Sequence, residues 1–178
     1  MTTTDQPNPE QLERRKAALA RVRKYGDPVL RETARPVAAV DAVVRDQIGE
    51  LRRLLEDAME AGLAATQIGV LARIFVYRAE PDGPVRALVN PQLEWVSAET
   101  EVAEEGCLSI PGVWIEVERP ARVRMRGLDE HGEPVVIDAA MPEARVLQHE
   151  LDHLDGVLTL DRTTKAQRRA ALRQLRLR

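Results

Sequence analysis

The sequence contains few of the features that mark several large protein classes. It has one cysteine, Cys107, in 178 residues. An internal disulfide is therefore excluded, and the thiol is buried, reactive or a metal ligand, with burial favoured by the count alone. Aromatic residues make up only 3% of the chain, so its core must consist mainly of Val, Leu, Ile and Ala. The length fits one domain of ordinary size.

Long apolar runs are also missing. No stretch approaches the roughly 20 apolar residues of a membrane span. The N-terminal "MTTTDQPNPEQLERRK" lacks the apolar segment of a secretory signal. We therefore expect a cytoplasmic protein whose partners include neither a membrane nor DNA.

Acidic residues are absent from the C-terminal end. Residues 162–178 contain seven basic residues and no acidic one. The whole chain has 26 basic and 29 acidic residues, so residues 1–161 have 19 and 29, a net charge of −10. Such a segment is typical of contact with an anionic partner such as RNA, and equally of a solvated terminal helix.

The apolar pattern predicts three helices. Residues 41–60 show helical periodicity, with Asp41 as the cap and Gly62 as the end of the helix. A second helix is expected from Pro142 to Leu154, closed by "DG" at 155–156. A third is expected over 164–176, and residues 1–9 are expected to be disordered.

The middle of the chain predicts antiparallel strands. "RIFVYR" (73–78) and "RALVN" (86–90) flank the turn signal "PDGP", which indicates a hairpin. Further strands are expected at "VWIEVE" (113–118), "ARVRMRG" (121–127) and "PVVID" (134–138). In 121–127, apolar and arginine side chains alternate, so one face is buried. The class is α+β, with antiparallel sheets packed around the helix that contains "QHELDHLDG".

The stretch "QHELDHLDG" (148–156) has the composition of a metal site. Residues four apart on a helix share a face, so His149 and His153 can bind one metal ion. Glu150 lies beside the first histidine and can act as a base on water without binding the metal. The alternative is that these are ordinary polar residues of a helix, because HExxH also arises by chance. His131 lies in a predicted turn, where we expect it to be exposed.

A catalytic metal site needs a third protein ligand. One class of HExxH protease uses a downstream Glu, but no Glu follows Glu150. Another continues HExxHxxGxxH or ends in Asp, but the last position here is Thr159. The remaining good ligand is Cys107, as a thiolate.

Three stretches together resemble the signature motifs of peptide deformylases, in the order found in that family. They are "GLAATQIGV" (62–70), "EEGCLSIPG" (104–112) and "QHELDHLDG". The resemblance covers about residues 25–162, with 1–24 as an N-terminal extension, partly disordered or helical, and 163–178 as a basic C-terminal helix. It implies removal of the formyl group from the N-terminal methionine of newly made proteins, with release of formate.

The resemblance also implies the roles of individual residues. Cys107, His149 and His153 would bind one divalent metal ion, with Fe²⁺ favoured and Zn²⁺, Ni²⁺ or Co²⁺ as alternatives. Glu150 would be the general base and acid. Gln67 and the Leu108 N–H would stabilise the oxyanion.

Two positions that are usually glycine in this family are expected to affect substrate binding. Gly62, which has no side chain, would let the backbone approach the substrate closely. The family usually has Gly at the position of Glu60, so this carboxylate is expected to narrow or recharge the entrance.

The resemblance also suggests a partner. N-formyl-methionyl nascent peptides are the expected substrates, and the basic tail is expected to contact the ribosome through Arg168, Arg169, Arg173 and Arg176. Two alternatives stay open, namely another HExxH metallohydrolase and a deformylase-like paralogue without activity.

Overall fold

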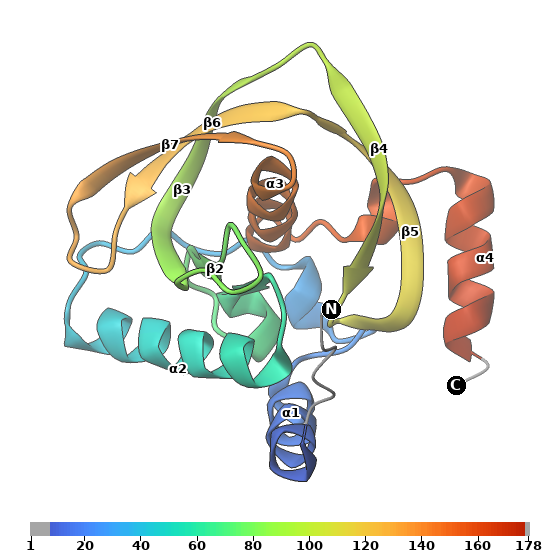
Figure 1. Cartoon of the computed structure of the whole chain (residues 1–178), viewed down its shortest axis with the longest axis horizontal. Helices are drawn as coiled ribbons and strands as arrows, with labels where there is room; N and C mark the ends of the chain where they lie inside the picture. The colour runs from blue at the N-terminus through green and yellow to red at the C-terminus, as the bar shows by residue number, and fades with distance from the viewer. Residues whose placement is uncertain (1–7, 177–178) are drawn as a thin grey trace, which may run out of the picture.

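The computed structural model describes residues 8–176, which contain four α-helices and seven β-strands (Figure 1). Residues 1–7, most of the segment expected to be disordered, lie outside the described residues. Helix α1 (Pro9–Arg21) begins at Asn8, whose side chain accepts a hydrogen bond from the backbone N–H of Gln11. Helix α4 (Lys165–Arg176) ends the described chain.

Helix α2 (Ala42–Ala58) agrees with the prediction at its start but not at its end. The Asp41 side chain accepts a hydrogen bond from the Val44 N–H at 3.0 Å, as a cap requires. The helix ends at Ala58, and Met59 adopts the left-handed conformation that closes it. The prediction that Gly62 ends this helix is therefore wrong, and Gly62 instead begins strand β1.

Five antiparallel strands form one sheet in the order β1-β2-β3-β6-β7, and β4 and β5 form a separate two-stranded ribbon. The predicted hairpin is confirmed, because Ile74 of β2 pairs with Val89 of β3. The predicted alternation is also confirmed in β6, where Val123 and Met125 are buried. The strands are β1 (Gly62–Ala64), β2 (Ile74–Tyr77), β3 (Arg86–Val96), β4 (Thr100–Cys107), β5 (Ile110–Pro120), β6 (Arg122–Leu128) and β7 (Pro134–Ala140).

Helix α3 (Glu143–Leu154) lies in the middle of the molecule, between the five-stranded sheet and the β4–β5 ribbon (Figure 1). Pro142 is its N-cap rather than its first helical residue. The apolar side of α3 packs on the sheet through Leu147 and Leu154, both fully buried, in a cluster that includes Phe75. The α+β class and the sheets around the HExxH helix are thus confirmed.

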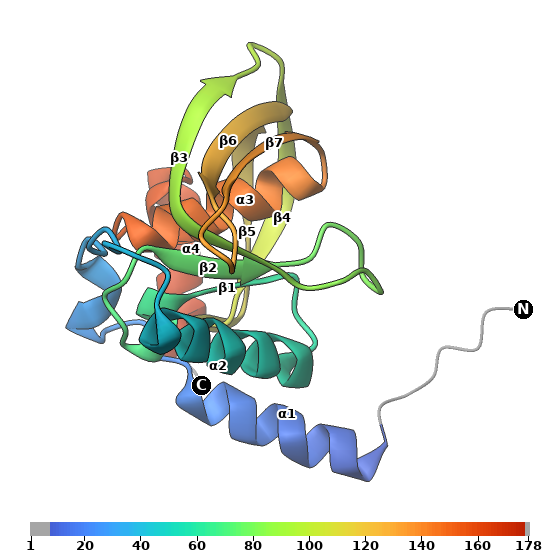
Figure 2. The same ribbon diagram turned by 90° about the vertical axis from the view of Figure 1, so that its left-hand side faces the viewer.

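The other helices pack on the outside of this core. Helix α2 places Leu51 and Leu55 against β2 in one apolar cluster. Helix α4 packs against β5 through Ala171. Helix α1 runs along α2, on the side of α2 that faces away from the sheet (Figure 2). Helix α3 therefore contacts strands of both the sheet and the ribbon, while α2 and α4 pack on the other side of those strands.

Candidate metal centre and active site

Helix α3 brings its two histidines together. His149 and His153 are four residues apart on one face, with their Nε2 atoms 3.2 Å apart. Cys107, at the end of β4, directs its Sγ to within 3.3 Å of His153 Nε2. One ligand atom from each of the three residues lies within 4.8 Å of the other two. Segments that are distant in the sequence thus converge on one point.

These distances fit a bound metal ion. For metal–nitrogen bonds of about 2.0–2.1 Å and a metal–sulfur bond of about 2.3 Å, tetrahedral ligand atoms lie roughly 3.4–3.6 Å apart. The observed separations of 3.2 and 3.3 Å are close to that value. Desolvation raises the pKa of the Cys107 thiol, but the facing imidazoles of His153 and His149 outweigh it and hold the pKa well below its usual range. The thiolate, which is the ligating form, is therefore favoured.

The sequence analysis missed Glu105, which orients the first histidine. His149 Nδ1 donates a hydrogen bond to Glu105 Oε2 at 2.9 Å, which leaves Nε2 free to face Cys107 and His153. Burial raises the pKa of Glu105, but hydrogen bonds from Arg119 and His149 outweigh burial and bring the pKa far below its ordinary value. Glu105 is therefore an ionised acceptor that fixes the tautomer of His149.

Buried arginines hold Glu105 in turn. Arg119 of β5, only 4% exposed, donates to both oxygens of Glu105 at 2.6 and 2.9 Å and to Asp152 at 2.9 Å. Arg145 of α3 adds a further hydrogen bond to Glu105 at 2.9 Å. The network links β4, β5 and α3 next to Cys107 and the two histidines. A doubled acidic residue two positions before the cysteine, in "EEGC", was the only sequence signal for it.

Glu150 lies beside the cluster without joining it. It is 3% exposed, and its Oε2 has no hydrogen-bond partner within residues 8–176. Burial raises the pKa of Glu150 to about 7, although the neighbouring His149 and His153 lower it. A carboxyl group with a pKa near neutrality can both accept and return a proton, as a general base and acid must.

Gly62 makes room for that carboxylate. A Cβ added at Gly62 would lie 2.3 Å from Glu150 Oε1 and 2.7 Å from its Cδ. The close approach that requires glycine here is therefore with Glu150. The sequence prediction assigned it to the substrate, and this contact gives a different physical reason for the same residue.

Gln67 is held with its amide nitrogen toward the cluster. Its Oε1 accepts a hydrogen bond from the Ala64 N–H at 2.9 Å, so Nε2 must point the other way. Nε2 lies 3.2 Å from Ser109 Oγ and 3.8 Å from Cys107 Sγ. The Gln67 side chain thus accepts a hydrogen bond from the end of β1 and directs its donor nitrogen toward Ser109 and Cys107.

The turn after Cys107 is tied to the segment that follows α1. Leu108 lies in this turn, between β4 and β5, and its carbonyl accepts a hydrogen bond from Lys24 Nζ at 3.1 Å. The next carbonyl, of Ser109, accepts from the Tyr25 N–H at 2.8 Å. The Arg23 N–H donates to the Gln67 carbonyl at 2.7 Å. Three consecutive residues therefore fix both segments in which the oxyanion donors are predicted.

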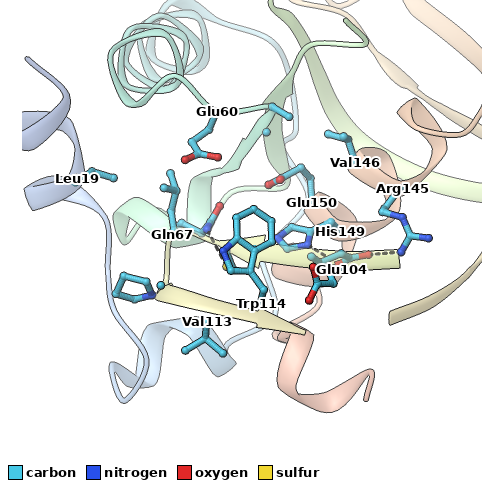
Figure 3. Close-up of a pocket in the computed structure, with 18 of the residues that line it drawn as sticks. Leu19, Glu60, Gln67, Glu104, Val113, Trp114, Arg145, Val146, His149 and Glu150 are labelled. Carbon is cyan, nitrogen blue, oxygen red and sulfur yellow. Dashed lines mark hydrogen bonds and ion pairs between the residues drawn. The ribbon is translucent and has the colours of Figure 1, made fainter. Parts of the chain in front are cut away.

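A cavity of about 650 Å³ that opens to the surface is lined by Gln67, Cys107, Leu108, His149 and Glu150. Figure 3 shows Gln67 on one side of the Trp114 ring and His149 and Glu150 on the other. Trp114 of β5 projects into the opening and is 66% exposed. A pocket of this size takes several residues of an extended peptide. His131 is exposed and does not line this cavity, in agreement with the prediction of exposure.

Comparison with known proteins agrees with this geometry. The family model described as polypeptide deformylase matches residues 19–169. A peptide deformylase of Acidothermus cellulolyticus is 46% identical over 159 residues, which cover 89% of this chain and 87% of that protein. One from Treponema pallidum is 45% identical, over 84% of this chain and 91% of the relative.

Solved structures show the same fold. The peptide deformylase of Synechococcus elongatus, in complex with actinonin, superimposes with a TM-score of 0.82 at 37% identity, over 86% of this chain and 85% of that chain. The enzyme of Legionella pneumophila gives 0.83 at 34% identity, over 88% and 92%.

The fold and the convergent cysteine, histidines and glutamate are those of a metal-dependent hydrolase of the HExxH type. The chain belongs to the polypeptide deformylase family. Its reaction is the metal-dependent hydrolysis of the N-formyl group from the formyl-methionine that begins newly made proteins, with release of formate.

In the part of the chain that the structure describes, no helix is both long and apolar enough to cross a membrane.

Proposed function

We propose that Cys107, His149 and His153 hold one divalent cation and that Glu150 moves the protons of the reaction. The observation that carries this proposal is the convergence of the three ligand atoms within 4.8 Å, beside a Glu150 oxygen that has no hydrogen-bond partner in the described part of the chain. A cation bound there acts as a Lewis acid and lowers the pKa of water to about 7. Three protein ligands leave a position open, as a catalytic site requires.

Each residue has a defined task in the proposed reaction. Glu150 takes the proton from the attacking water and later gives it to the departing amine nitrogen. Gln67 Nε2 and the Leu108 N–H donate to the formyl oxygen as it gains negative charge. One such donor is typically worth about 2.7–4 kcal/mol in the transition state. The geometry of Gln67 supports this role, because its Oε1 is already used by Ala64.

We propose Fe²⁺ as the native cation, with Zn²⁺, Ni²⁺ or Co²⁺ as substitutes. The ligand set supports a transition metal, since imidazole and thiolate both suit iron and zinc. The buried Glu105 beside His149 makes the imidazole a better donor. Metal analysis of protein purified without oxygen tests the identity.

The first prediction concerns Glu150. Glu150→Ala should retain the cation but lose at least about 100-fold in kcat/KM for formyl-Met-Ala, since general acid–base catalysis contributes roughly 10²–10⁴-fold. Formate release and metal content would be measured on the same anaerobically iron-loaded samples. Turnover at the parent rate would show that Glu150 is not the base.

The rival hydrolase and inactive-paralogue hypotheses are tested by the same assay. A panel of formyl-Met peptides and unmodified peptides separates a deformylase from a protease. The described chain offers three convergent ligands rather than the four of a closed structural site. Release of no formate by the metal-loaded parent protein would favour the inactive paralogue.

We further propose that the enzyme acts in the cytoplasm on nascent chains and contacts the ribosome through α4. Arg169, Arg173 and Arg176 are exposed on this helix, whereas Arg168 pairs with Asp161 at 3.4 Å. The exposed arginines support contact with RNA phosphates, which would make binding depend strongly on salt.

A further inference from the structure

Helix α1 forms part of the substrate pocket although most of it lies outside the region matched by the family model, which begins at residue 19. Arg15 and Leu19 of α1 line the same cavity as Glu150 and His149. Figure 3 shows Leu19 on the side of the cavity opposite His149, with the Glu60 carboxylate directed into the space between. The pocket is therefore incomplete without this helix.

The contact that holds α1 at the cavity involves Glu60. Arg15 approaches Glu60 Oε1 to 3.5 Å with one guanidinium nitrogen and donates from Nε to the Ala58 carbonyl at 3.1 Å. Glycine at position 60, which is usual in the family, would leave Arg15 without this carboxylate. Glu60 and α1 are thus joined by one interaction at the cavity.

Apolar packing does little to hold α1. Ala18 is its one buried residue, and Leu12 is 49% exposed. The helix instead contacts α2 through ion pairs, Arg14 with Asp57 and Arg21 with Glu50, both at 2.5 Å. Exposed pairs of this kind are each worth only about 0.2–1 kcal/mol. The position of α1 therefore depends on individual charges, and the Arg15–Glu60 pair is the one at the cavity.

We propose that the Arg15–Glu60 pair fastens α1 as the outer wall of the substrate pocket and that this wall binds the peptide beyond the formyl-methionine. The formyl group must reach Glu150 and Gln67, so the following residues extend toward the opening at about 3.3 Å per residue. Leu19 and Trp114 then contact these residues from opposite sides of the opening. Arg15 and Glu60 are positioning residues, since they act through the placement of α1. The inference rests on the deformylase reaction of this pocket.

The test separates binding from chemistry. Arg15→Ala and Glu60→Ala should each raise KM for formyl-Met-Ala-Ser about three- to tenfold and change kcat less than twofold. The charge exchange Arg15→Glu with Glu60→Arg should restore KM to within about twofold of the parent. Restoration by the exchange would show that the two side chains act as a pair, and the unchanged kcat would place their effect on binding.

The matched control is Arg21→Ala, which removes the ion pair that Arg21 of α1 makes with Glu50 of α2, away from the cavity. Its KM should stay within about twofold of the parent. An equal rise in KM for Arg21→Ala would overturn the assignment to Arg15 and Glu60, because general loosening of α1 would explain both. Unchanged KM in Arg15→Ala would also overturn it.

A second measurement does not depend on turnover. Saturating product peptide Met-Ala-Ser should slow amide hydrogen exchange in residues 9–21 of the metal-loaded parent, and less so in Glu60→Ala. No protection of α1 in the parent would overturn the proposal. If the parent protein released no formate, the deformylase reaction itself would be contradicted. If the parent released formate normally and the variants had no effect on KM, only the proposed role of α1 in peptide binding would be contradicted.

Discussion

At the scale of single residues, the site depends on a glycine that makes room for a charged side chain. Gly62 has no side chain because the Glu150 carboxylate occupies the space where a Cβ would lie. The opposing atoms belong to a flexible side chain, so a substituent would displace Glu150 rather than prevent folding. Gly62 thus controls the position of the proposed base from a different element.

Gly62→Ala should therefore reduce kcat/KM for formyl-Met-Ala by about 10- to 100-fold, since a displacement of about 1 Å can cost roughly 100-fold. The melting temperature should change by only a few degrees. The control is Gly49→Ala on α2, where an added Cβ meets no atom within 4 Å. This variant should keep full activity and gain up to about 1 kcal/mol in free energy of unfolding from helix propensity. Full activity in Gly62→Ala would refute the argument.

Much of the site could be predicted at this scale, and its supporting residues could not. The spacing of His149 and His153 gives a ligand pair directly, because a helix fixes which residues share a face. Glu105 and Arg119 are 14 residues apart and meet only because β4 and β5 pair. No local pattern encodes that meeting. Likewise, the end of α2 was misplaced because Met59, which is not a glycine, closes the helix in the left-handed conformation.

At the scale of elements, β4, β5 and α3 share one buried charge network. Arg119 bridges the buried carboxylates of Glu105 and Asp152, and each of these carboxylates also contacts a second arginine, Arg145 and Arg162 respectively. Breaking such a network by removing one partner is strongly destabilising, because the remaining charge stays buried. The network therefore fixes the ribbon relative to the helix that supplies two of the three proposed ligands.

Glu105→Gln should weaken binding of the divalent cation by about 10- to 100-fold, the usual cost of losing the residue that orients a ligating histidine. The dissociation constant for Zn²⁺ or Co²⁺ would be measured by competition with a chelator. Glu104→Gln is the matched control, because this neighbouring carboxylate is exposed and makes no ion pair within residues 8–176. If the two variants bound the cation with equal affinity, Glu105 would not have the proposed role of orienting His149.

At the scale of the whole molecule, charge is distributed unevenly. The basic residues gather at the C-terminal end, while the rest of the chain is acidic overall. Helix α4 packs on β5 through Ala171, and Gln174 donates to the Gly112 carbonyl at 3.1 Å. Deleting the helix would therefore uncover part of the core, so substitution of its exposed arginines is the cleaner test of the ribosome proposal.

Replacing Arg169, Arg173 and Arg176 by Gln should weaken co-sedimentation with ribosomes by at least tenfold at low salt and flatten its salt dependence, because fewer phosphates are neutralised. Hydrolysis of formyl-Met-Ala should be unaffected. Replacing three exposed arginines elsewhere (Arg122, Arg124 and Arg126 of β6) controls for net charge. Equal ribosome binding by the two triple variants would contradict a specific role for α4.

The end of β4 also limits which insertions and deletions the sequence can tolerate during evolution. Glu105 and Cys107 both contact histidines of α3, whereas Glu104 is exposed and the ring of Trp114 lies against Gly106. Inserting or deleting one residue in 104–107 would shift this alternation, so that the Glu105 carboxylate, the Cys107 thiol or both would no longer face α3. Length variation among descendants of this sequence should therefore accumulate in turns such as 80–84 and spare these four positions.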